Sequence, residues 1–208
     1  MGNKYYAAIA GVLIGCGPKP TTNTADVTPA VTMALAVPAT PTPLLDTVTK
    51  SIAISAPHLS EGRRKLLAGM LTHIAGEVFD SRTHQDFWVA LVGVESRYEG
   101  TARSPAGAVG LGQLLPKFAT GFAQSCGLPE ITAADVGDDY TNAYISACVF
   151  KGLIAANDGS ITLAMVGYNA GQASKSMVNV KRGGNPVEET SGYVTRIHAK
   201  QEQNGATK

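Results

Sequence analysis

The chain lacks the charge imbalance that nucleic-acid-binding proteins usually show. It has 208 residues, of which 17 are Lys or Arg and 16 are Asp or Glu, so its formal net charge is only +1. No dense run of basic residues occurs in the sequence. Because binding to phosphate groups normally requires a basic patch, we expect no nucleic-acid partner. The hydrophobic content of 44% is ordinary for a globular protein and is sufficient for a core.

A hydrophobic run long enough to span a membrane is also missing. The apolar run 7–14 falls far short of the ~20 residues that cross a bilayer. With Lys4 before it, the run is typical of the core of a signal peptide. It ends in Leu-Ile-Gly-Cys16, which resembles the bacterial lipobox, where the cysteine becomes the lipidated first residue of the mature protein. We therefore predict a lipoprotein-type signal peptide over residues 1–15. The alternative is an ordinary signal peptide, or an uncleaved anchor, with an incidental cysteine.

Cysteine is scarce, and only Cys126 and Cys148 remain when Cys16 is set aside. An even pair in an exported domain is consistent with a disulfide, although two small buried thiols fit the sequence nearly as well. Neither cysteine has a neighbouring histidine that would make it a nucleophile. We predict no metal and no cofactor, because metal-ligand spacing is absent from the four histidines, His58, His73, His84 and His198.

Proline is rare except near the N-terminus. Six of the 11 prolines lie between Pro18 and Pro43, in a stretch of Thr, Pro, Ala and Val that has neither a helical nor a strand period. This composition is typical of a semi-extended linker. We assign residues 16–57 to a flexible linker, whose last part is ambiguous, and residues 58–208 to a folded domain.

Hairpin signals and internal repeats are absent, and the remaining patterns are helical. Ser60 can cap a helix whose apolar residues, from Leu66 to Phe79, recur with a period of 3.6. Gly171 is expected as the left-handed cap of a helix over 161–170. The sequence thus predicts a small, mostly α domain. Caps and first-turn prolines predict the other helix starts at Thr83 with Asp86, at Pro116, at Asp139 or Thr141, at Ser160 and at Asn185-Pro186.

Glu95 stands at the end of an apolar helical run that begins at Trp88. The hydrocarbon before it should partly desolvate the carboxyl group, which favours the protonated form and raises the pKa. A carboxylic acid that keeps its proton near neutral pH can serve as a general acid. Taken alone, Glu95 would more simply be a surface residue at a helix end.

Three separated motifs change that interpretation. The first is Glu95-Ser-Arg-Tyr98, with Ser104 after it, and the second is Gly110-Leu-Gly-Gln113. The third is Gly167-Tyr-Asn-Ala-Gly171, followed by a Glu-Thr-x-x-Tyr-Val sequence over 189–194. Any one of these motifs is weak, but together and in this order they are specific.

In order and content the motifs resemble those of the soluble lytic transglycosylase (SLT) catalytic domain. That domain has a lysozyme-like helical fold with a substrate groove, and it cleaves peptidoglycan. The resemblance covers residues 88–194. In that family a tyrosine of the third motif steadies the catalytic glutamate or the adjacent sugar. A methionine is usual where this chain has Gly112, so we expect one apolar wall of the groove to be missing. The resemblance implies that Glu95 is the single catalytic acid and base, and that the substrate groove is lined by Ser104, Gln113, Tyr168, Asn169 and Glu189.

The resemblance also implies a non-hydrolytic reaction. Glu95 would protonate the oxygen that links N-acetylmuramic acid to the next N-acetylglucosamine, while the substrate's own N-acetyl group stabilises C1. The same glutamate would then take the proton of the C6 hydroxyl, which closes onto C1 as a 1,6-anhydro sugar. The expected partners are peptidoglycan strands and, through Cys16, a membrane, and the expected location is the periplasm or cell envelope.

Two alternatives stay open at this point. A muramidase-type hydrolase on the same fold would need a second carboxylate to activate water or to act as nucleophile. Glu99 is expected to face solvent, and Glu189 is the only other carboxylate expected near the groove. The second alternative is a peptidoglycan-binding component of an envelope-spanning secretion, conjugation or phage assembly.

Overall fold

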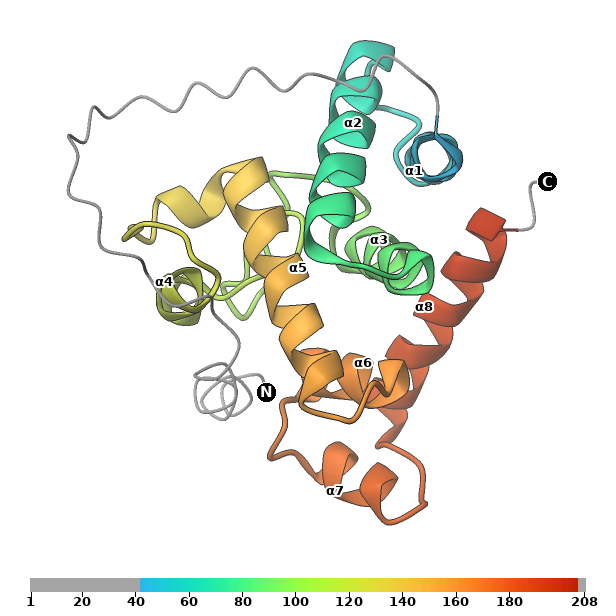
Figure 1. Cartoon of the computed structure of the whole chain (residues 1–208), viewed down its shortest axis with the longest axis vertical. Coiled ribbons are helices and arrows are strands. Elements are labelled where there is room, and N and C mark those ends of the chain that lie inside the picture. Colours follow the sequence, from blue (N-terminus) through green and yellow to red (C-terminus); the bar gives the residue numbers. More distant parts are fainter. Residues whose placement is uncertain (1–41, 206–208) are drawn as a thin grey trace.

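Helices account for nearly all regular structure in residues 42–205, the part of the chain that the computed structural model describes (Figure 1). Within these residues the only extended pairing is two isolated β-bridges, Arg103 with Val109 and Val109 with Leu114. The predicted mostly α class is confirmed. The helices are α1 (Pro43–Ser55), α2 (Glu61–Val78), α3 (Arg82–Ser96), α4 (Pro116–Ser125), the short 3₁₀ helix η2 (Asp135–Gly137), α5 (Asp139–Ala155), α6 (Ile161–Ala170), α7 (Lys175–Lys181) and α8 (Glu188–Gly205).

The N-terminal predictions fall mainly outside this part of the chain. The signal peptide over 1–15, Cys16 and the linker as far as residue 41 lie outside the described residues. No helix among residues 42–205 is both long enough and apolar enough to cross a bilayer.

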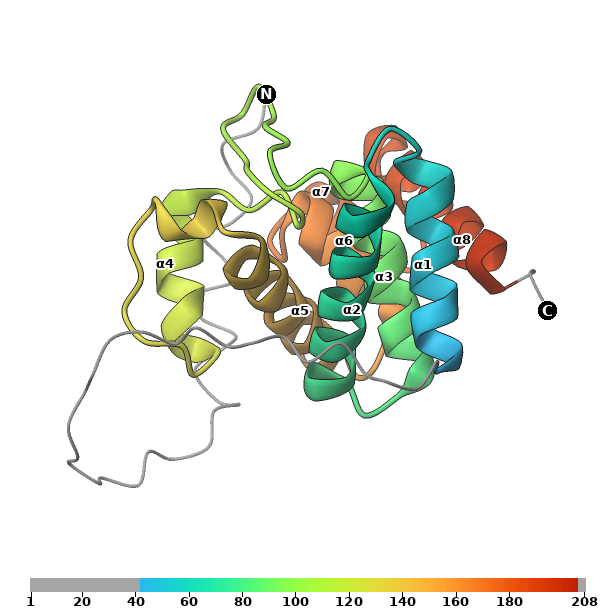
Figure 2. The same ribbon diagram turned by 90° about the horizontal axis from the view of Figure 1, so that it is seen from above.

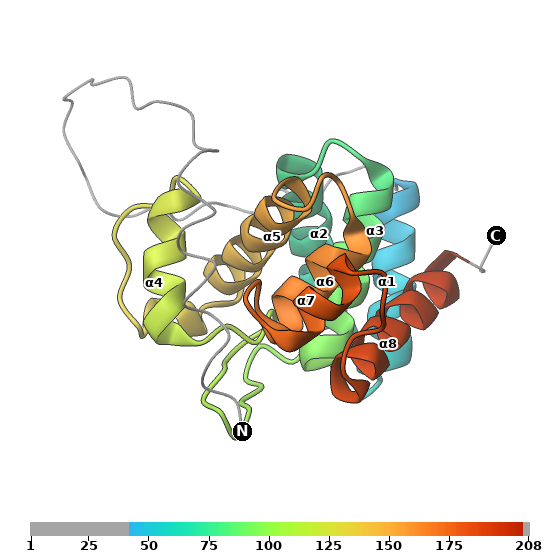
Figure 3. The same cartoon turned by 90° about the horizontal axis from the view of Figure 1, so that it is seen from below.

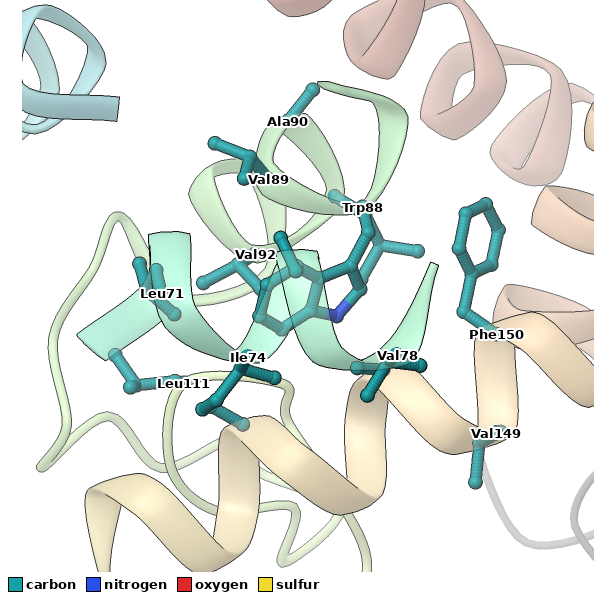
Figure 4. Close-up of a cluster of buried hydrophobic side chains, with 14 of the residues drawn as sticks. Leu71, Ile74, Val78, Trp88, Val89, Ala90, Val92, Leu111, Val149 and Phe150 are labelled. Carbon is teal, nitrogen blue, oxygen red and sulfur yellow. The ribbon is translucent and has the colours of Figure 1, made fainter. Parts of the chain in front are cut away.

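The core forms where α2, α3 and α5 meet around the single tryptophan. Trp88 is fully buried, and apolar side chains from the three helices surround it (Figure 4). Its indole N–H donates to Ser146 Oγ of α5 at 3.1 Å, so the polar edge of the ring is satisfied inside the core. Trp88 stands two turns before Glu95 on α3. The packing around Trp88 therefore also fixes the position of the helix whose last turn carries Glu95.

The predicted linker ends too late in the sequence, because α1 occupies most of its last part. Thr42 caps this helix by accepting from Leu45 N at 3.2 Å, and a proline occupies the first turn. Leu44, Val48 and Ile52 recur every four residues and are buried. Helix α1 itself lies beside α2 and α3 (Figure 2). The folded domain therefore begins at about residue 42 rather than at residue 58.

The other helix starts follow the predicted caps to different degrees. Ser60 and Ser160 cap α2 and α6 through their hydroxyl groups, and Pro116 opens α4, as predicted. α3 starts slightly earlier than predicted, after Ser81. α5 starts at Asp139, where Asp138 accepts from Thr141 N at 2.9 Å. α8 starts only at Glu188, so Pro186 is not its first residue. Helix α7 has no counterpart among the predicted elements.

A disulfide joins α4 to α5. Cys126, which caps the C-terminal end of α4, is bonded to Cys148, with their Cα atoms 5.9 Å apart. The sequence left this pair open between a disulfide and two free thiols, and the structure has the disulfide. Closing a loop of this length adds about 3 kcal/mol to stability in the chain-entropy model. The bond fixes α4, which lies at the edge of the molecule (Figure 1).

Replacing one isoleucine of α1 tests whether this helix belongs to the folded unit. Ile52 is fully buried, whereas Ile54 on the same helix is 54% exposed. We expect Ile52→Ala to lower the free energy of unfolding by about 2–5 kcal/mol because it leaves a cavity, and Ile54→Ala to change it by less than about 0.5 kcal/mol. Urea denaturation of the full chain measures both. If both variants changed the free energy of unfolding equally and only slightly, residues 43–55 would belong to the linker instead of the folded domain.

Candidate active site

Glu95 lies in the last turn of α3 and contacts Tyr193 of α8. Helix α8 packs against α3 although it is distant in sequence (Figure 3). α8 buries Tyr193 and Ile197, one turn apart, against the rest of the domain. The Tyr193 hydroxyl donates to Glu95 Oε1 at 2.6 Å. This short hydrogen bond links two side chains 98 residues apart and orients the carboxyl group.

The surroundings of Glu95 change its acidity. The side chain is half-buried, and burial raises the pKa of the Glu95 carboxyl to about 7. The Tyr193 hydrogen bond and the positive charge of Arg196 favour the ionised form, but they only partly offset the effect of burial. At neutral pH the protonated and ionised forms are therefore both populated. A group that must first give a proton and then take one needs a pKa near the working pH.

The residue after Glu95 closes the helix. Ser96 Oγ donates to the Val92 carbonyl oxygen at 3.1 Å and accepts from the backbone N–H of Tyr98, also at 3.1 Å. This hydroxyl thus satisfies one helical carbonyl and one amide of the following turn, both of which are buried. In the Glu-Ser pair of the first motif, Glu95 thus stands on the last turn of the helix, and the Ser96 hydroxyl stabilises the end of that helix.

A loop from residue 97 to residue 115 carries the second motif and extends from the end of α3 (Figure 2). The loop is held from inside by Asn142 of α5, which is fully buried. Its amide nitrogen donates to the carbonyl oxygens of Val109 and Val136, both at 2.9 Å, and its Oδ1 accepts from Gly112 N at 2.7 Å. Gly110 has φ 76°, and a Cβ at this position would collide with the Asn142 side chain. Nothing in the sequence singled out Asn142, whose partners lie 6 to 33 residues away.

Ser104 and Gln113, two of the predicted groove residues, both stabilise this loop. Ser104 Oγ accepts from Ala108 N at 3.0 Å and so closes a tight turn. Gln113 is mostly buried, has a left-handed φ of 50°, and donates from Nε2 to the carbonyl oxygens of Ala102 and Gly110 at 3.2 and 3.0 Å. Each residue holds the backbone of the loop, and substrate binding by either stays a prediction.

Tyr168 occupies the interior, and the hydroxyl that contacts Glu95 is that of Tyr193. The Tyr168 hydroxyl donates to the Gly112 carbonyl oxygen at 2.8 Å and lies 3.1 Å from Ser146 Oγ. Tyr168 is only 2% exposed, so it supports the second motif from inside the domain. The tyrosine hydroxyl that donates to Glu95 is thus that of Tyr193 on α8, whereas a role of Tyr168 beside the substrate stays a prediction. The sequence marked Tyr193 only as part of the motif ending.

Gly112 does not remove a wall from a groove, as the sequence suggested. A Cβ built at this position would lie 2.6 Å from Ser146 Oγ and 3.0 Å from the Tyr168 hydroxyl. The position therefore faces the interior, where the missing side chain leaves room for the hydrogen bonds among Ser146, Tyr168 and Trp88. The expectation of a looser substrate site at Gly112 was wrong for this steric reason.

Within residues 42–205, Asn169 and Glu189 make no side-chain hydrogen bond or ion pair, and substrate binding by either stays a prediction. Asn169 is half-buried in the last turn of α6. Gly171 follows as the cap with a positive φ of 87°, but its ψ of 151° differs from that of the left-handed cap we predicted. Glu189 is exposed in the first turn of α8, one turn before Tyr193. The Glu99 carboxylate contacts Nε2 of His58, which lies in the segment that joins α1 to α2. Among residues 42–205, no group of three His, Cys, Asp or Glu side chains is arranged to hold a metal.

Comparisons with known proteins agree with the motifs. The profile of the transglycosylase SLT domain matches residues 80–189. The chain is similar in structure to the lytic transglycosylase Slt from Pseudomonas aeruginosa, solved as an inactive mutant, with a TM-score of 0.55 and 23% identity. It is also similar to the 70 kDa soluble lytic transglycosylase from Escherichia coli, with a TM-score of 0.53 and 19% identity. At these identities the two structures show a shared fold.

The similarity covers much more of this chain than of the two solved proteins. The aligned regions cover 66% of this chain and 23% of the P. aeruginosa protein, and 78% of this chain and 29% of the E. coli protein. The chain therefore spans about a quarter of the length of each. The predicted lysozyme-like helical fold is confirmed for this shared part.

The acidity of Glu95 can be measured without a substrate. We expect its side-chain carbon to titrate near pH 7 in ¹³C NMR spectra of the full chain. In Tyr193→Phe the titration should move up by about one unit, because a hydrogen bond to the ionised form is lost. Tyr140→Phe is the control, since Tyr140 stacks on Tyr144 of the same helix, α5. A midpoint near 4.5 in the wild type, the ordinary value for glutamate, would contradict a desolvated carboxyl.

Proposed function

Because the chain belongs to the transglycosylase SLT domain family, whose profile matches more than half of it, we propose that it is a peptidoglycan lytic transglycosylase. The observation that supports this proposal best is the environment of Glu95. It is a half-buried carboxyl with a pKa raised to about 7, and a tyrosine hydroxyl orients it. One group with this acidity can act in both steps of a non-hydrolytic cleavage.

In the first step Glu95 acts as a general acid. Its proton passes to the oxygen that links N-acetylmuramic acid to N-acetylglucosamine, and the bond between this oxygen and C1 breaks. The N-acetyl group of the muramic acid supplies electrons to C1, as in substrate-assisted glycosidases, so no protein nucleophile is required. The Tyr193 hydroxyl stabilises the carboxylate that forms, since it already donates to Oε1.

In the second step the ionised Glu95 acts as a general base. It removes the proton of the C6 hydroxyl, and the C6 oxygen forms a bond to C1 as the acetyl oxygen leaves C1 and takes its electron pair back. The product is a 1,6-anhydro-muramic acid end, and Glu95 is protonated again. No water enters the balance, and the positive charge of Arg196 favours the ionised form of Glu95 between the two steps.

The surroundings of the two other candidate carboxylates favour this reaction over hydrolysis. A hydrolase would place a second carboxylate about 5–9.5 Å from the first, free to attack or to activate water. Glu99 is engaged by His58, and Glu189 is exposed at the start of α8. A muramidase-type hydrolase that uses Glu189 remains the alternative, because this residue lies one turn from Tyr193. The biological setting we propose is the periplasm or cell envelope, either in wall remodelling or within an envelope-spanning assembly.

Mass spectrometry of the released fragments tests the reaction directly. The full chain, purified and incubated with peptidoglycan, should release products one water lighter than muropeptides with reducing ends. Glu95→Gln should lower their yield by more than about 100-fold, since the proton donor and acceptor is lost. Glu99→Gln is a matched control that should leave the yield nearly unchanged.

Other outcomes would redirect the proposal. Reducing ends in the products would identify a hydrolase, and Glu189→Gln would then be the next variant. Full activity of Glu95→Gln would remove Glu95 from the reaction. No fragments from the wild type, together with measurable binding to the wall, would support a binding component of an envelope assembly.

Attachment to a membrane is a separate proposal, which is motivated by the sequence Leu-Ile-Gly-Cys16 after a short apolar run. A lipid on Cys16 would hold the enzyme at the membrane surface. We expect Cys16→Ser to move most of the protein from the membrane fraction to the soluble fraction of cells that express the full chain. Cys126→Ser, which changes the disulfide but not the anchor, serves as the control. An unchanged membrane fraction in Cys16→Ser would refute the lipid anchor.

A further inference from the structure

Three residues after Glu95, the chain adopts a strained conformation around a buried tyrosine. Arg97 and Tyr98 have φ values of 56° and 64°, although neither is glycine. Left-handed backbone costs such residues about 1–2 kcal/mol each. Strain of this kind persists only where the surroundings enforce it, and it occurs most often at functional sites. Here the two residues reverse the chain, so that the Tyr98 side chain, which is fully buried, packs back against α3.

The Tyr98 hydroxyl is held from two sides. It donates to the carbonyl oxygen of Val89, which lies six residues before Glu95 on α3, at 3.2 Å. Ser51 Oγ of α1 lies 2.6 Å from the same hydroxyl. Since the single proton of the tyrosine is directed to Val89, Ser51 is the donor in the second bond. Both hydroxyl groups are fully buried, so water cannot replace either partner.

A glycine lets the ring approach the helix closely. A Cβ at Gly93 would lie 2.8 Å from the Tyr98 hydroxyl oxygen, 3.0 Å from Cζ and 3.1 Å from Cε2. Glycine inside a helix costs about 1 kcal/mol relative to alanine. At Gly93 this loss of helix stability accompanies the close approach of the Tyr98 ring. Gly93 lies two residues before Glu95. The ring therefore lies directly against the turn of α3 that carries the candidate acid.

We propose that Tyr98, held by Ser51 and accommodated by Gly93, is a positioning residue for Glu95. The ring fixes the last turn of α3 and so sets the position of the carboxyl group relative to Tyr193. The inference rests on the proposed role of Glu95. Because Ser51 precedes residues 80–189, the part of this chain needed for catalysis extends beyond the family match and includes α1.

Gly93→Ala is the most direct perturbation, because the new methyl group must displace the ring. A misplacement of about 1 Å can cost about 100-fold in rate. We expect kcat to fall at least about tenfold with little change in KM, and the ¹³C titration of Glu95 to move away from its wild-type midpoint. Gly76→Ala on α2 is the matched control, because a Cβ there meets nothing within 4 Å.

A double variant separates positioning from general destabilisation. Tyr98→Phe removes the atom nearest to the new methyl group and should alone lower kcat a few-fold. Gly93→Ala with Tyr98→Phe should nevertheless be more active than Gly93→Ala, because the shortest contact is gone. Tyr98→Phe would thus lower kcat in the wild type but raise it in Gly93→Ala. Two independent losses of stability would not produce such a change in the sign of the effect. Thermal unfolding of each variant, measured in parallel, shows that kcat is compared between folded proteins.

The outcomes distinguish this inference from the proposed function. If Glu95→Gln is active, the proposed function itself fails. If Glu95→Gln is inactive but the folded Gly93→Ala protein keeps its kcat and the Glu95 titration, the positioning role alone is overturned. If Gly93→Ala does not fold, Tyr98→Phe and Ser51→Ala decide, since both keep the packing. Wild-type kcat and an unchanged Glu95 titration in both would refute the proposal.

Discussion

The packing of α8 against α3 is the constraint on which the rest of the site depends. It brings Tyr193 within hydrogen-bonding distance of Glu95 and removes enough water from the carboxyl group to raise its pKa. Neither helix could supply this environment alone. An isolated α3 would leave Glu95 in solvent, with an ordinary acidity. Other helices support this pair from both sides, because α1, α2 and α5 pack against α3 while α1 and α6 pack against α8.

The loop beside Glu95 is ordered by polar groups that come from inside the core. Asn142 makes two hydrogen bonds to backbone groups of the loop, at Val109 and Gly112, and a third to Val136 of η2, and Tyr168 makes another to Gly112. A loop without strands or helices has many backbone groups to satisfy, and buried ones are costly if they stay unpaired. Two helices that carry no candidate catalytic group, α5 and α6, therefore determine the shape of the surface beside the acid. Such fully satisfied buried networks make a local structure rigid.

Local hydrogen bonds explain which parts of the fold could be predicted from the sequence. Ser60, Pro116 and Ser160 mark helix starts correctly because a cap depends only on the next few residues. α1 was missed because its composition continues that of the linker, although Thr42-Pro43 is a cap followed by a first-turn proline. α7 is short, and its sequence has no clear period.

Glu95 could be proposed as the acid only from its apolar helix together with the three separated motifs, because its own helix would also fit a surface residue. Its contact with Tyr193 could not be predicted, because α8 packs on α3 only in the folded chain. The roles of Asn142, Ser146 and Ser51 rest on contacts 22 to 58 residues apart, which no sequence period encodes. Gly112 was misinterpreted because the sequence does not show whether a side chain at this position would point into a groove or into the interior.

The close contact between Gly112 and Ser146 has an evolutionary consequence. Because a Cβ at residue 112 would overlap Ser146, the two positions form one steric unit despite their separation in the sequence. A relative that carries a large residue at the first position must repack the second, or shift the loop and the tyrosine hydroxyl beneath it. The identities at these two positions should therefore change together among homologues, and neither can drift alone without a cost to folding.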